Sequence, residues 1–225
     1  PTENTNKIGI DLGLMNYAAD SDGRQIKHPK HLHLSLNKLK KAQRHLSRKK
    51  KRSHNRTKQR IKVARIHEKI VNQRDDFLHK LSRYYVDNYG FIAVENLNVN
   101  GLIKLSYNPR NIMDASWSRF IQMLCCKAAS AGCTVMKVEP RGTTQRCSSC
   151  GRDVPKKLWD RIHSCSCGIT LDRDYNAALN ILQRALGQEL AEATPVEIEP
   201  LPYLVSLVNE AGRSGALALS SSQTC

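Results

Sequence analysis

The most informative segment of the sequence is Cys147–Ile181, which reads CSSCGRDVPKKLWDRIHSCSCGITLDRDYNAALNI. It begins with two close cysteine pairs, each followed by a glycine of the kind that tight turns use; the pairs are Cys147 with Cys150 and Cys165 with Cys167. Two thiolate pairs on two tight turns supply the tetrahedral ligand set that zinc prefers. An acidic segment with Asp172 and Asp174 follows at once and opens an apolar-periodic helix.

The composition indicates a polyanionic partner. The chain has 225 residues, with 36 Lys or Arg against 20 Asp or Glu, a net charge of +16. Nucleic acid is the commonest partner of such a chain, although charge alone does not separate DNA from RNA. The sequence shows no N-terminal hydrophobic segment of the signal-peptide type and no apolar run of membrane-spanning length. We therefore expect a soluble, cytoplasmic, nucleoid-associated protein that contacts no membrane.

The expected cytoplasmic location also decides whether the four cysteines bind zinc or form disulfides. Disulfides are rare in cytosolic proteins, so we favour a structural Zn²⁺ ion. His163 stands two residues before Cys165 and could replace one thiolate, but the four cysteines already complete a site. Cys125, Cys126 and Cys133 fall in an apolar segment and are expected to be free core thiols.

The positive charge is concentrated between Lys38 and Lys69. This segment holds fifteen Lys or Arg and one acid, Glu68. Apolar periodicity predicts two helices, broken at residues 53–55, that form an antiparallel hairpin over residues 34–86. A solvated polar face is the ordinary explanation of a charged run, but such faces mix signs and this one does not. We therefore expect an arm that binds phosphates, with contacts from Lys38, Lys41, Arg44, Arg48, Lys49, Lys50, Lys51, Arg52, Arg56, Lys58 and Arg60.

The remaining pattern predicts a mixed α/β fold, because short apolar or β-branched runs alternate with amphipathic helices. Strands are expected at 7–14, 17–19, 25–26, 90–95 and 134–138, helices at 115–131 and 174–187, a loop at 106–111 and a zinc ribbon at 143–170. Asp114 or Ser116 is expected to cap the helix at 115–131. Residues 188–225 are acidic, with several prolines and a serine run, and are expected to be disordered.

Three carboxylates lie at the ends of predicted strands or at the start of a predicted helix. Asp11 lies near the end of the first strand, Glu95 ends the fourth strand, and Asp174 begins the last helix. The first and fourth strands of an α/β sheet can be neighbours, and a helix packed on them can bring its N-terminus to the same edge. Three converging carboxylates attract divalent cations, and two Mg²⁺ or Mn²⁺ ions about 4 Å apart can hydrolyse a phosphodiester. Asp172 competes for the third position, but Asp174 is nearer to the helix.

Four motifs together resemble one known family. IGIDLG at 8–13, VENLNV at 94–99, the two cysteine pairs and DRDYNAALNIL at 172–182 resemble the RuvC-like nuclease core of the TnpB (OrfB) transposon-encoded proteins, relatives of the type V CRISPR effector nucleases. The resemblance spans about residues 7–187 and implies an RNase H-like mixed sheet with the hairpin and the zinc ribbon inserted. It implies that Asp11, Glu95 and Asp174 are catalytic acids that bind Mg²⁺ or Mn²⁺, and that the four cysteines bind zinc.

The resemblance also implies a function and partners. Family members cleave DNA under the guidance of an RNA and are associated with transposition, so DNA and a guide RNA are the expected partners. They carry an N-terminal half of recognition modules before the first nuclease strand, whereas this chain begins six residues before that strand. A missing or separately encoded N-terminal half is therefore a further expected partner. The alternative function is a non-catalytic zinc-ribbon protein that binds DNA or RNA with strong salt dependence.

Overall fold

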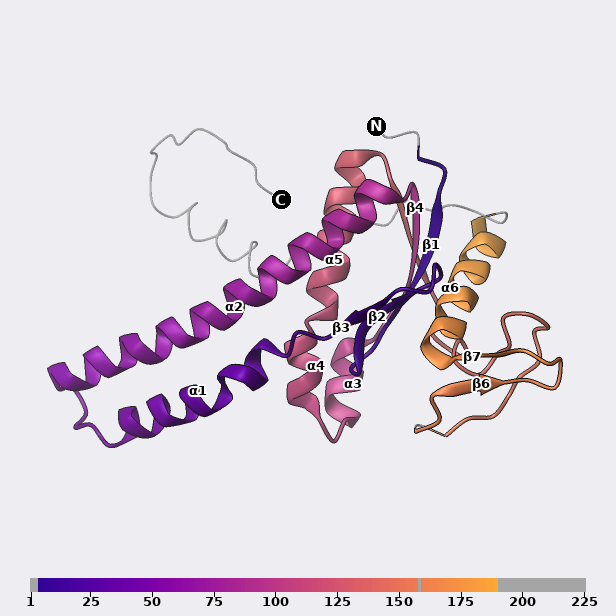
Figure 1. The fold of residues 1–225 in the computed structure, drawn as a ribbon. Helices are drawn as coiled ribbons and strands as arrows, with labels where there is room; N and C mark the ends of the chain where they lie inside the picture. The colour runs from indigo at the N-terminus through magenta and orange to yellow at the C-terminus, as the bar shows by residue number, and fades with distance from the viewer. Residues whose placement is uncertain (1–3, 158, 190–225) are drawn as a thin grey trace.

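A five-stranded mixed sheet forms the centre of the fold (Figure 1). The computed structural model describes residues 4–157 and 159–189. The strands are β1 (Lys7–Leu12), β2 (Asn16–Asp20), β3 (Gln25–Lys27), β4 (Phe91–Glu95) and β5 (Thr134–Val138), in the order β3-β2-β1-β4-β5. The first three strands form an antiparallel meander, and β4 and β5 run parallel to β1. The five predicted strands are confirmed, with β1 ending two residues earlier than expected.

Helices cover both faces of the sheet (Figure 1). On one face lie α2 (His54–Asn88) and α5 (Trp117–Ala131), and on the other lies α6 (Arg173–Glu189). The helix α1 (His31–Ser47) packs along α2, and α3 (Val99–Leu105) and α4 (Pro109–Ala115) connect β4 to α5. A separate two-stranded sheet of β6 (Ile162–Ser164) and β7 (Thr170–Asp172) lies beside α6.

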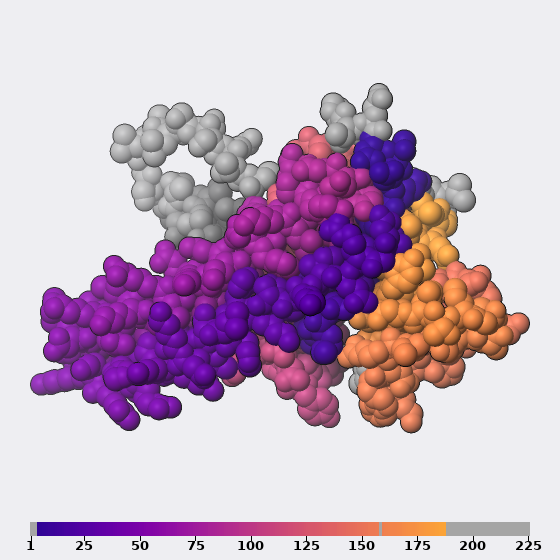
Figure 2. Space-filling view, in the orientation of Figure 1, coloured from indigo at the N-terminus to yellow at the C-terminus, as the bar shows by residue number. Residues whose placement is uncertain are grey.

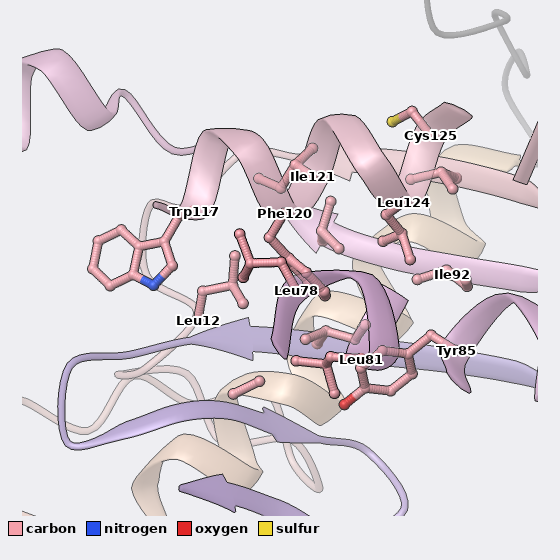
Figure 3. Close-up of a cluster of buried hydrophobic side chains, with 14 of the residues drawn as sticks. Leu12, Leu78, Leu81, Tyr85, Ile92, Trp117, Phe120, Ile121, Leu124 and Cys125 are labelled. Atoms are coloured by element: carbon pink, nitrogen blue, oxygen red, sulfur yellow. The ribbon is translucent and has the colours of Figure 1, made fainter. Parts of the chain in front are cut away.

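The larger core lies between the sheet and the helices α2 and α5 (Figure 3). Alternate residues of the two central strands point into it, namely Ile8, Ile10 and Leu12 of β1 and Ile92 and Val94 of β4. They meet side chains that include Leu78, Tyr85, Phe120 and Leu124, each fully buried. Because successive side chains of a strand point to opposite faces, the intervening residues of β1 and β4 face α6.

The close approach of α6 to β1 depends on a glycine. A Cβ atom at Gly9 would lie 2.2 Å from the carbonyl oxygen of Ala178 and 2.8 Å from the backbone nitrogen of Leu182. Only a residue without a side chain therefore lets the helix lie directly on this strand. A smaller core of Phe91, Ala93, Val138, Ile181 and Ala185 completes the contact.

The helices α1 and α2 extend from the sheet as a hairpin arm (Figure 1). Ser53 caps α2, because its hydroxyl accepts a hydrogen bond from the backbone nitrogen of Arg56 at 3.2 Å. The Arg56 guanidinium donates to the carbonyl oxygens of Leu46 at 3.1 Å and Lys49 at 3.3 Å, which closes the turn from the other side. The break predicted at 53–55 therefore ends at Ser53, and residues 54 and 55 are already helical.

The predicted loop at 106–111 is confirmed only for residues 106–108, because α3 ends at Leu105 and α4 begins at Pro109. Asn98 caps α3 by accepting a hydrogen bond from the backbone nitrogen of Gly101 at 2.9 Å. Pro109 lies in the first turn of α4. The backbone nitrogens of a first turn donate no hydrogen bond within the helix, so a proline is tolerated there.

The predicted cap of the helix at 115–131 is wrong. Ser116 occupies the N-cap position of α5, but its φ of 52° is left-handed and its side chain makes no cap bond. Its hydroxyl instead donates to the carbonyl oxygen of Met113 at 3.0 Å. Asp114 forms an ion pair with Arg74 at 2.6 Å, which ties α4 to α2.

Two further predictions concern the C-terminal tail and membrane-spanning segments. The acidic tail predicted from residue 188 lies almost wholly outside the described residues, and α6 itself reaches Glu189. Among residues 4–157 and 159–189, no helix has the length and apolar character that crossing a bilayer requires.

Candidate functional site

Asp11 and Glu95 lie at the same edge of the central sheet. The strands β1 and β4 are parallel neighbours, and Ile10 is paired with Val94, the residues that directly precede the two acids. Both acids belong to the face that α6 covers, and they are only 8% and 6% exposed. The carboxyl ends of parallel strands are the usual ligand-binding edge of an α/β sheet.

The first turn of α6 brings Asp174 to this edge. Asp174 precedes Ala178 by one helical turn, and Ala178 lies against Gly9, two residues before Asp11. The Arg173 guanidinium forms an ion pair with Asp174 at 3.0 Å. The structure therefore brings the three predicted acids to one region of the molecule, and Asp174 carries a basic partner.

Asp172 has a different role from Asp174. Its Oδ1 atom accepts hydrogen bonds from the backbone nitrogens of Asp174 at 2.9 Å and Tyr175 at 3.1 Å. These contacts satisfy backbone donors at the start of α6, as a helix-capping aspartate does. Of the two candidates for the third acid of the site, Asp172 is the one that fixes the start of α6.

The charged form of Asp11 is disfavoured. Burial raises the pKa of Asp11 well above its ordinary value, and the charges of Glu95, Asp174 and Asp172 raise it further, while Arg173 opposes them. Burial also raises the pKa of Glu95, against the hydrogen bond from Thr143 and the charge of Arg184. Buried carboxylates that repel one another are stabilised by a bound cation, so this donor set fits a divalent metal ion.

The acids are less tightly gathered than the cysteines. Within the described part of the chain, only the four cysteines form a group of three or more potential ligands whose atoms meet closely enough to hold a metal. Asp174 is ion-paired with Arg173, and Glu95 accepts a hydrogen bond from Thr143. Mg²⁺ retains several waters and needs few carboxylates, so a looser oxygen set still suits it.

The ribbon cysteines form a compact cluster. Their sulfur atoms all lie within 4.8 Å of one another, with Cys147 Sγ 3.8 Å from Cys167 Sγ and Cys150 Sγ 3.5 Å from Cys165 Sγ. A tetrahedron with metal–sulfur distances of about 2.3 Å places its sulfurs about 3.8 Å apart, whereas a disulfide requires about 2 Å. All four thiols are free. The cluster can therefore hold a metal ion, and its geometry is not that of two disulfides.

The cysteines differ from His163 in their surroundings. A backbone hydrogen bond from Cys167 lowers the pKa of Cys165 to about 6, which favours the thiolate that binds metals. His163 is fully buried, and its Nδ1 atom is hydrogen-bonded to Lys156 Nζ. Burial lowers the pKa of His163, and the Lys156 charge lowers it further. His163 lies outside the metal-binding cluster and packs inside the ribbon.

The basic hairpin presents its charge to solvent. Figure 2 shows the arm extending from the body of the molecule. Ten of the eleven residues predicted to contact phosphates are exposed: Lys38, Lys41, Arg44, Arg48, Lys49, Lys50, Lys51, Arg52, Lys58 and Arg60. The eleventh, Arg56, is half-buried and its guanidinium is bound to carbonyl oxygens in the turn, so it supports the arm rather than extending from it.

A second basic feature lies beside Glu95. A cavity of about 360 Å³ lies between the first cysteine turn and α6, and its charged lining residues are Arg146 and Arg184. The charge of Arg184, one of the lining residues, also lowers the pKa of Glu95. Its lining contains no acid, and a phosphate group would meet favourable charge there.

Three buried polar residues of this region are not among the residues predicted from the sequence. Thr143 is 2% exposed, Asn176 is fully buried and Asn180 is 5% exposed. Asparagine is unfavourable inside a helix, and a buried one requires hydrogen-bond partners. The NAALN segment places two asparagines one turn apart on the apolar face of its helix, and this pattern was the available signal.

Known proteins match both parts of the chain. A family model described as "Probable transposase" matches residues 1–106, and one described as "Cas12f1-like, TNB domain" matches residues 117–181. A Streptomyces pristinaespiralis protein named "Putative RNA-guided DNA endonuclease" is 40% identical over 184 residues, covering 81% of this chain and 46% of the relative. The Sulfoacidibacillus thermotolerans protein named "CRISPR-associated endodeoxyribonuclease Cas12f1" is 33% identical over 148 residues, covering 62% and 34%.

A solved structure agrees with the fold. The structure described as "Cryo-EM structure of the Cas12f1-sgRNA-target DNA complex" matches with a TM-score of 0.56 at 20% identity, covering 78% of this chain and 49% of that chain. At this identity the likeness concerns the fold alone.

Fold and site together define a mixed α/β domain with strand-end carboxylates, a cysteine ribbon able to hold a metal and a basic helical arm. The chain belongs to the TnpB (OrfB) family of transposon-encoded proteins, to which the Cas12f1 proteins are related. It spans about half the length of the curated relatives it matches, with 46% and 54% coverage of two of them.

Proposed function

We propose that this chain forms the catalytic part of a divalent-metal-dependent DNA endonuclease that a guide RNA directs to its target. The observation that carries the proposal is the meeting of Asp11, Glu95 and Asp174, from two strands and one helix, at a single sheet edge. The names of the relatives from Streptomyces and Sulfoacidibacillus support an endonuclease, and the first of them also supports an RNA guide.

We assign residues 7–187 to an RNase H-like (RuvC-like) nuclease domain, with the hairpin at 34–86 and the ribbon at 143–170 as insertions. The antiparallel meander of β3, β2 and β1, continued by two parallel strands and covered by α6, supports this assignment. Residues 188–225 would follow the domain as a tail. The ribbon would bind a structural Zn²⁺ ion through Cys147, Cys150, Cys165 and Cys167.

Each part of the proposed site has a distinct task. Asp11, Glu95 and Asp174 would hold two Mg²⁺ or Mn²⁺ ions, and Asp172 keeps Asp174 in place by capping α6. When bound, such ions activate a water molecule and stabilise the leaving oxygen of a phosphodiester. Arg146 and Arg184 would orient a phosphate beside Glu95. The exposed lysines and arginines of the hairpin would bind the nucleic-acid backbone without reading its sequence.

Cleavage of labelled single-stranded DNA in Mg²⁺ tests this function. The chain would be assayed alone and with a guide RNA and the N-terminal half of the Streptomyces relative supplied separately. We expect cleavage by the wild type and none by Asp11→Asn, because a neutral amide cannot replace the buried charge in holding a cation. Asp76→Asn is the control, since Asp76 is exposed and paired with Lys80 on α2. Equal products from wild type and Asp11→Asn would end the catalytic interpretation.

The second candidate is a non-catalytic protein that binds DNA or RNA through the hairpin and the ribbon. The exposed positive charge of the segment between Lys38 and Lys69, which contains one acid, favours it independently of the acids at the sheet edge. It predicts salt-dependent binding with no cleavage under any of these conditions, and no effect of Asp11→Asn on binding.

A further inference from the structure

Thr143 connects the zinc ribbon to Glu95. It is 2% exposed, and its Oγ1 atom lies 2.6 Å from Glu95 Oε1 and 3.0 Å from the carbonyl oxygen of Pro140. A hydroxyl carries one proton, and a hydrogen bond to a carboxylate is stronger than one to a neutral carbonyl. The Thr143 hydroxyl therefore donates to Glu95 and fixes one of its two oxygens.

An asparagine of α6 holds the backbone of Thr143. The Asn180 Nδ2 atom donates to the carbonyl oxygens of Thr143 at 2.8 Å and Arg146 at 2.6 Å, which uses both of its amide hydrogens. One turn earlier, Asn176 donates to Arg146 at 2.8 Å and accepts a hydrogen bond from the backbone nitrogen of Ser148 at 3.0 Å. Both asparagines are buried, so the loss of either would leave unpaired backbone groups.

The segment held in this way contains the first cysteine of the ribbon. Cys147 lies between Arg146 and Ser148, is 1% exposed and belongs to the metal-binding cluster. The position of the ribbon and the position of the Thr143 hydroxyl are therefore set by the same short run of backbone. Through this run, the ribbon is joined to a carboxylate 48 residues away from Thr143 in the sequence.

We propose that Thr143 is a positioning residue for Glu95, and that Asn180 transmits the placement of the ribbon to this carboxylate. The inference rests on the proposed function, in which Glu95 helps to hold divalent cations. Thr143 occupies one carboxylate oxygen and leaves the other for the cation. It stops the Glu95 side chain from rotating, and it does not itself touch the reacting atoms.

Mn²⁺ binding to the full chain, followed by electron paramagnetic resonance, tests the role of Thr143. Thr143→Val keeps the shape but removes the hydroxyl, and we expect it to weaken Mn²⁺ binding about tenfold, the usual worth of a hydrogen bond to a charged group. Thr143→Ser restores the hydroxyl and should bind Mn²⁺ as the wild type does. Thr57→Val, on the exposed hairpin surface, is the matched control.

A double-mutant cycle tests the role of Asn180. Asn180→Ala should weaken Mn²⁺ binding in the wild-type background but have little further effect in Thr143→Val, because the two act through one contact. Fully additive effects would show that Asn180 acts by another route. Zinc content and thermal unfolding identify variants that do not fold; if Asn180→Ala is one of them, the two Thr143 variants decide the proposal by themselves.

The outcomes separate this inference from the function on which it rests. If wild type binds Mn²⁺, Asp11→Asn does not, and Thr143→Val binds like wild type, the positioning role is wrong and the metal site stands. If wild type shows no Mn²⁺ binding that depends on Asp11, both proposals are overturned.

Discussion

Asp11 is a carboxyl group whose charged form the fold disfavours. Burial and the charges of Glu95 and Asp174 raise its pKa above the ordinary value. A raised pKa means that the contribution of Asp11 to stability is complete below about pH 3.9, the ordinary value for aspartate, and is lost as the pH rises through the pKa of the folded state. Without a bound cation, Asp11 therefore destabilises the folded chain at neutral pH.

Asp11→Asn should consequently unfold at a higher temperature than wild type at pH 7.5 without added divalent cations. The amide carries no charge at any pH, so the difference should shrink as the pH is lowered. Added Mg²⁺ should stabilise the wild type but not the variant, because only the wild type binds it in the folded state. Thermal unfolding followed by circular dichroism measures both effects; identical pH dependence in the two proteins would contradict this account of the site.

Single residues differ in how far the sequence reveals their roles. Asp11 and Glu95 could be selected from the sequence because each interrupts or ends an apolar strand, where a charge is costly unless it is paired or bound to a cation. The role of Thr143 could not be predicted, since its partners Glu95 and Asn180 lie 48 and 37 residues away. The sequence predicts a phosphate contact for Arg56, because its charge is visible there and its carbonyl partners are not.

The contact between β1 and α6 positions the site, and Gly9 makes it possible. Gly9→Ala would place a Cβ atom 2.2 Å from the Ala178 carbonyl oxygen, so the helix would have to move. We expect a loss of about 1–3 kcal/mol in the free energy of unfolding, the usual cost of overpacking, and weaker Mn²⁺ binding. Gly187→Ala on α6 is the control, because nothing lies within 4 Å of its Cβ position and alanine favours a helix. Urea unfolding of the two variants should give opposite signs; equal effects would refute the close contact.

The fold of the ribbon should depend on a bound metal ion. We expect one zinc per chain, lost in Cys147→Ser together with the ordered structure of the ribbon, because a site with few apolar contacts folds only with the ion bound. The five-stranded sheet has its own core and should remain folded. Cys126→Ser, at a half-buried thiol outside the cluster, should keep its zinc. Elemental analysis and hydrogen exchange measure the two effects, and a folded ribbon free of metal would exclude this role.

Elements with a clear period were predictable, and short ones were not. Alternation of apolar residues identifies the strands in the sequence, and helical spacing of apolar residues identifies the long helices. The helices α3 and α4 have seven residues each and expose most of their side chains, so they carry little periodicity. Pro109 is a typical loop residue in sequence terms, but it lies in the first turn of α4, the position where a helix accepts proline.

The described part of the molecule concentrates positive charge on the hairpin, where fifteen Lys or Arg residues and one acid lie between Lys38 and Lys69. Replacing Lys49, Lys50, Lys51 and Lys58 by glutamine should weaken nucleic-acid binding and flatten its dependence on salt. The slope of log K against log salt should fall by about 0.7–0.9 for each lysine that contacts a phosphate. The control replaces Lys80 and Arg83, which are ion-paired further along α2. Fluorescence anisotropy at several salt concentrations measures the slope; equal slopes for both variants would place the interface elsewhere.

The arrangement of the sheet was predictable only in outline. The sequence indicates a mixed fold, because strands and helices alternate with a hairpin inserted between them. The sequence leaves β1 and β4 as possible neighbours, and the parallel pairing that includes Ile10 with Val94 confirms that they are. The packing of α6 on the opposite face from α2 and α5 depends on Gly9 and on the small residues of NAALN, which periodicity alone does not place.

The central claim is that carboxylates from β1, β4 and α6 bind divalent cations together. Anomalous diffraction from crystals of the chain grown with Mn²⁺ tests it most directly. The account predicts Mn²⁺ density in contact with Asp11, Glu95 and Asp174, and no such density in crystals of Asp11→Asn. Mn²⁺ density only elsewhere on the molecule, with the three carboxylates unliganded, would contradict it.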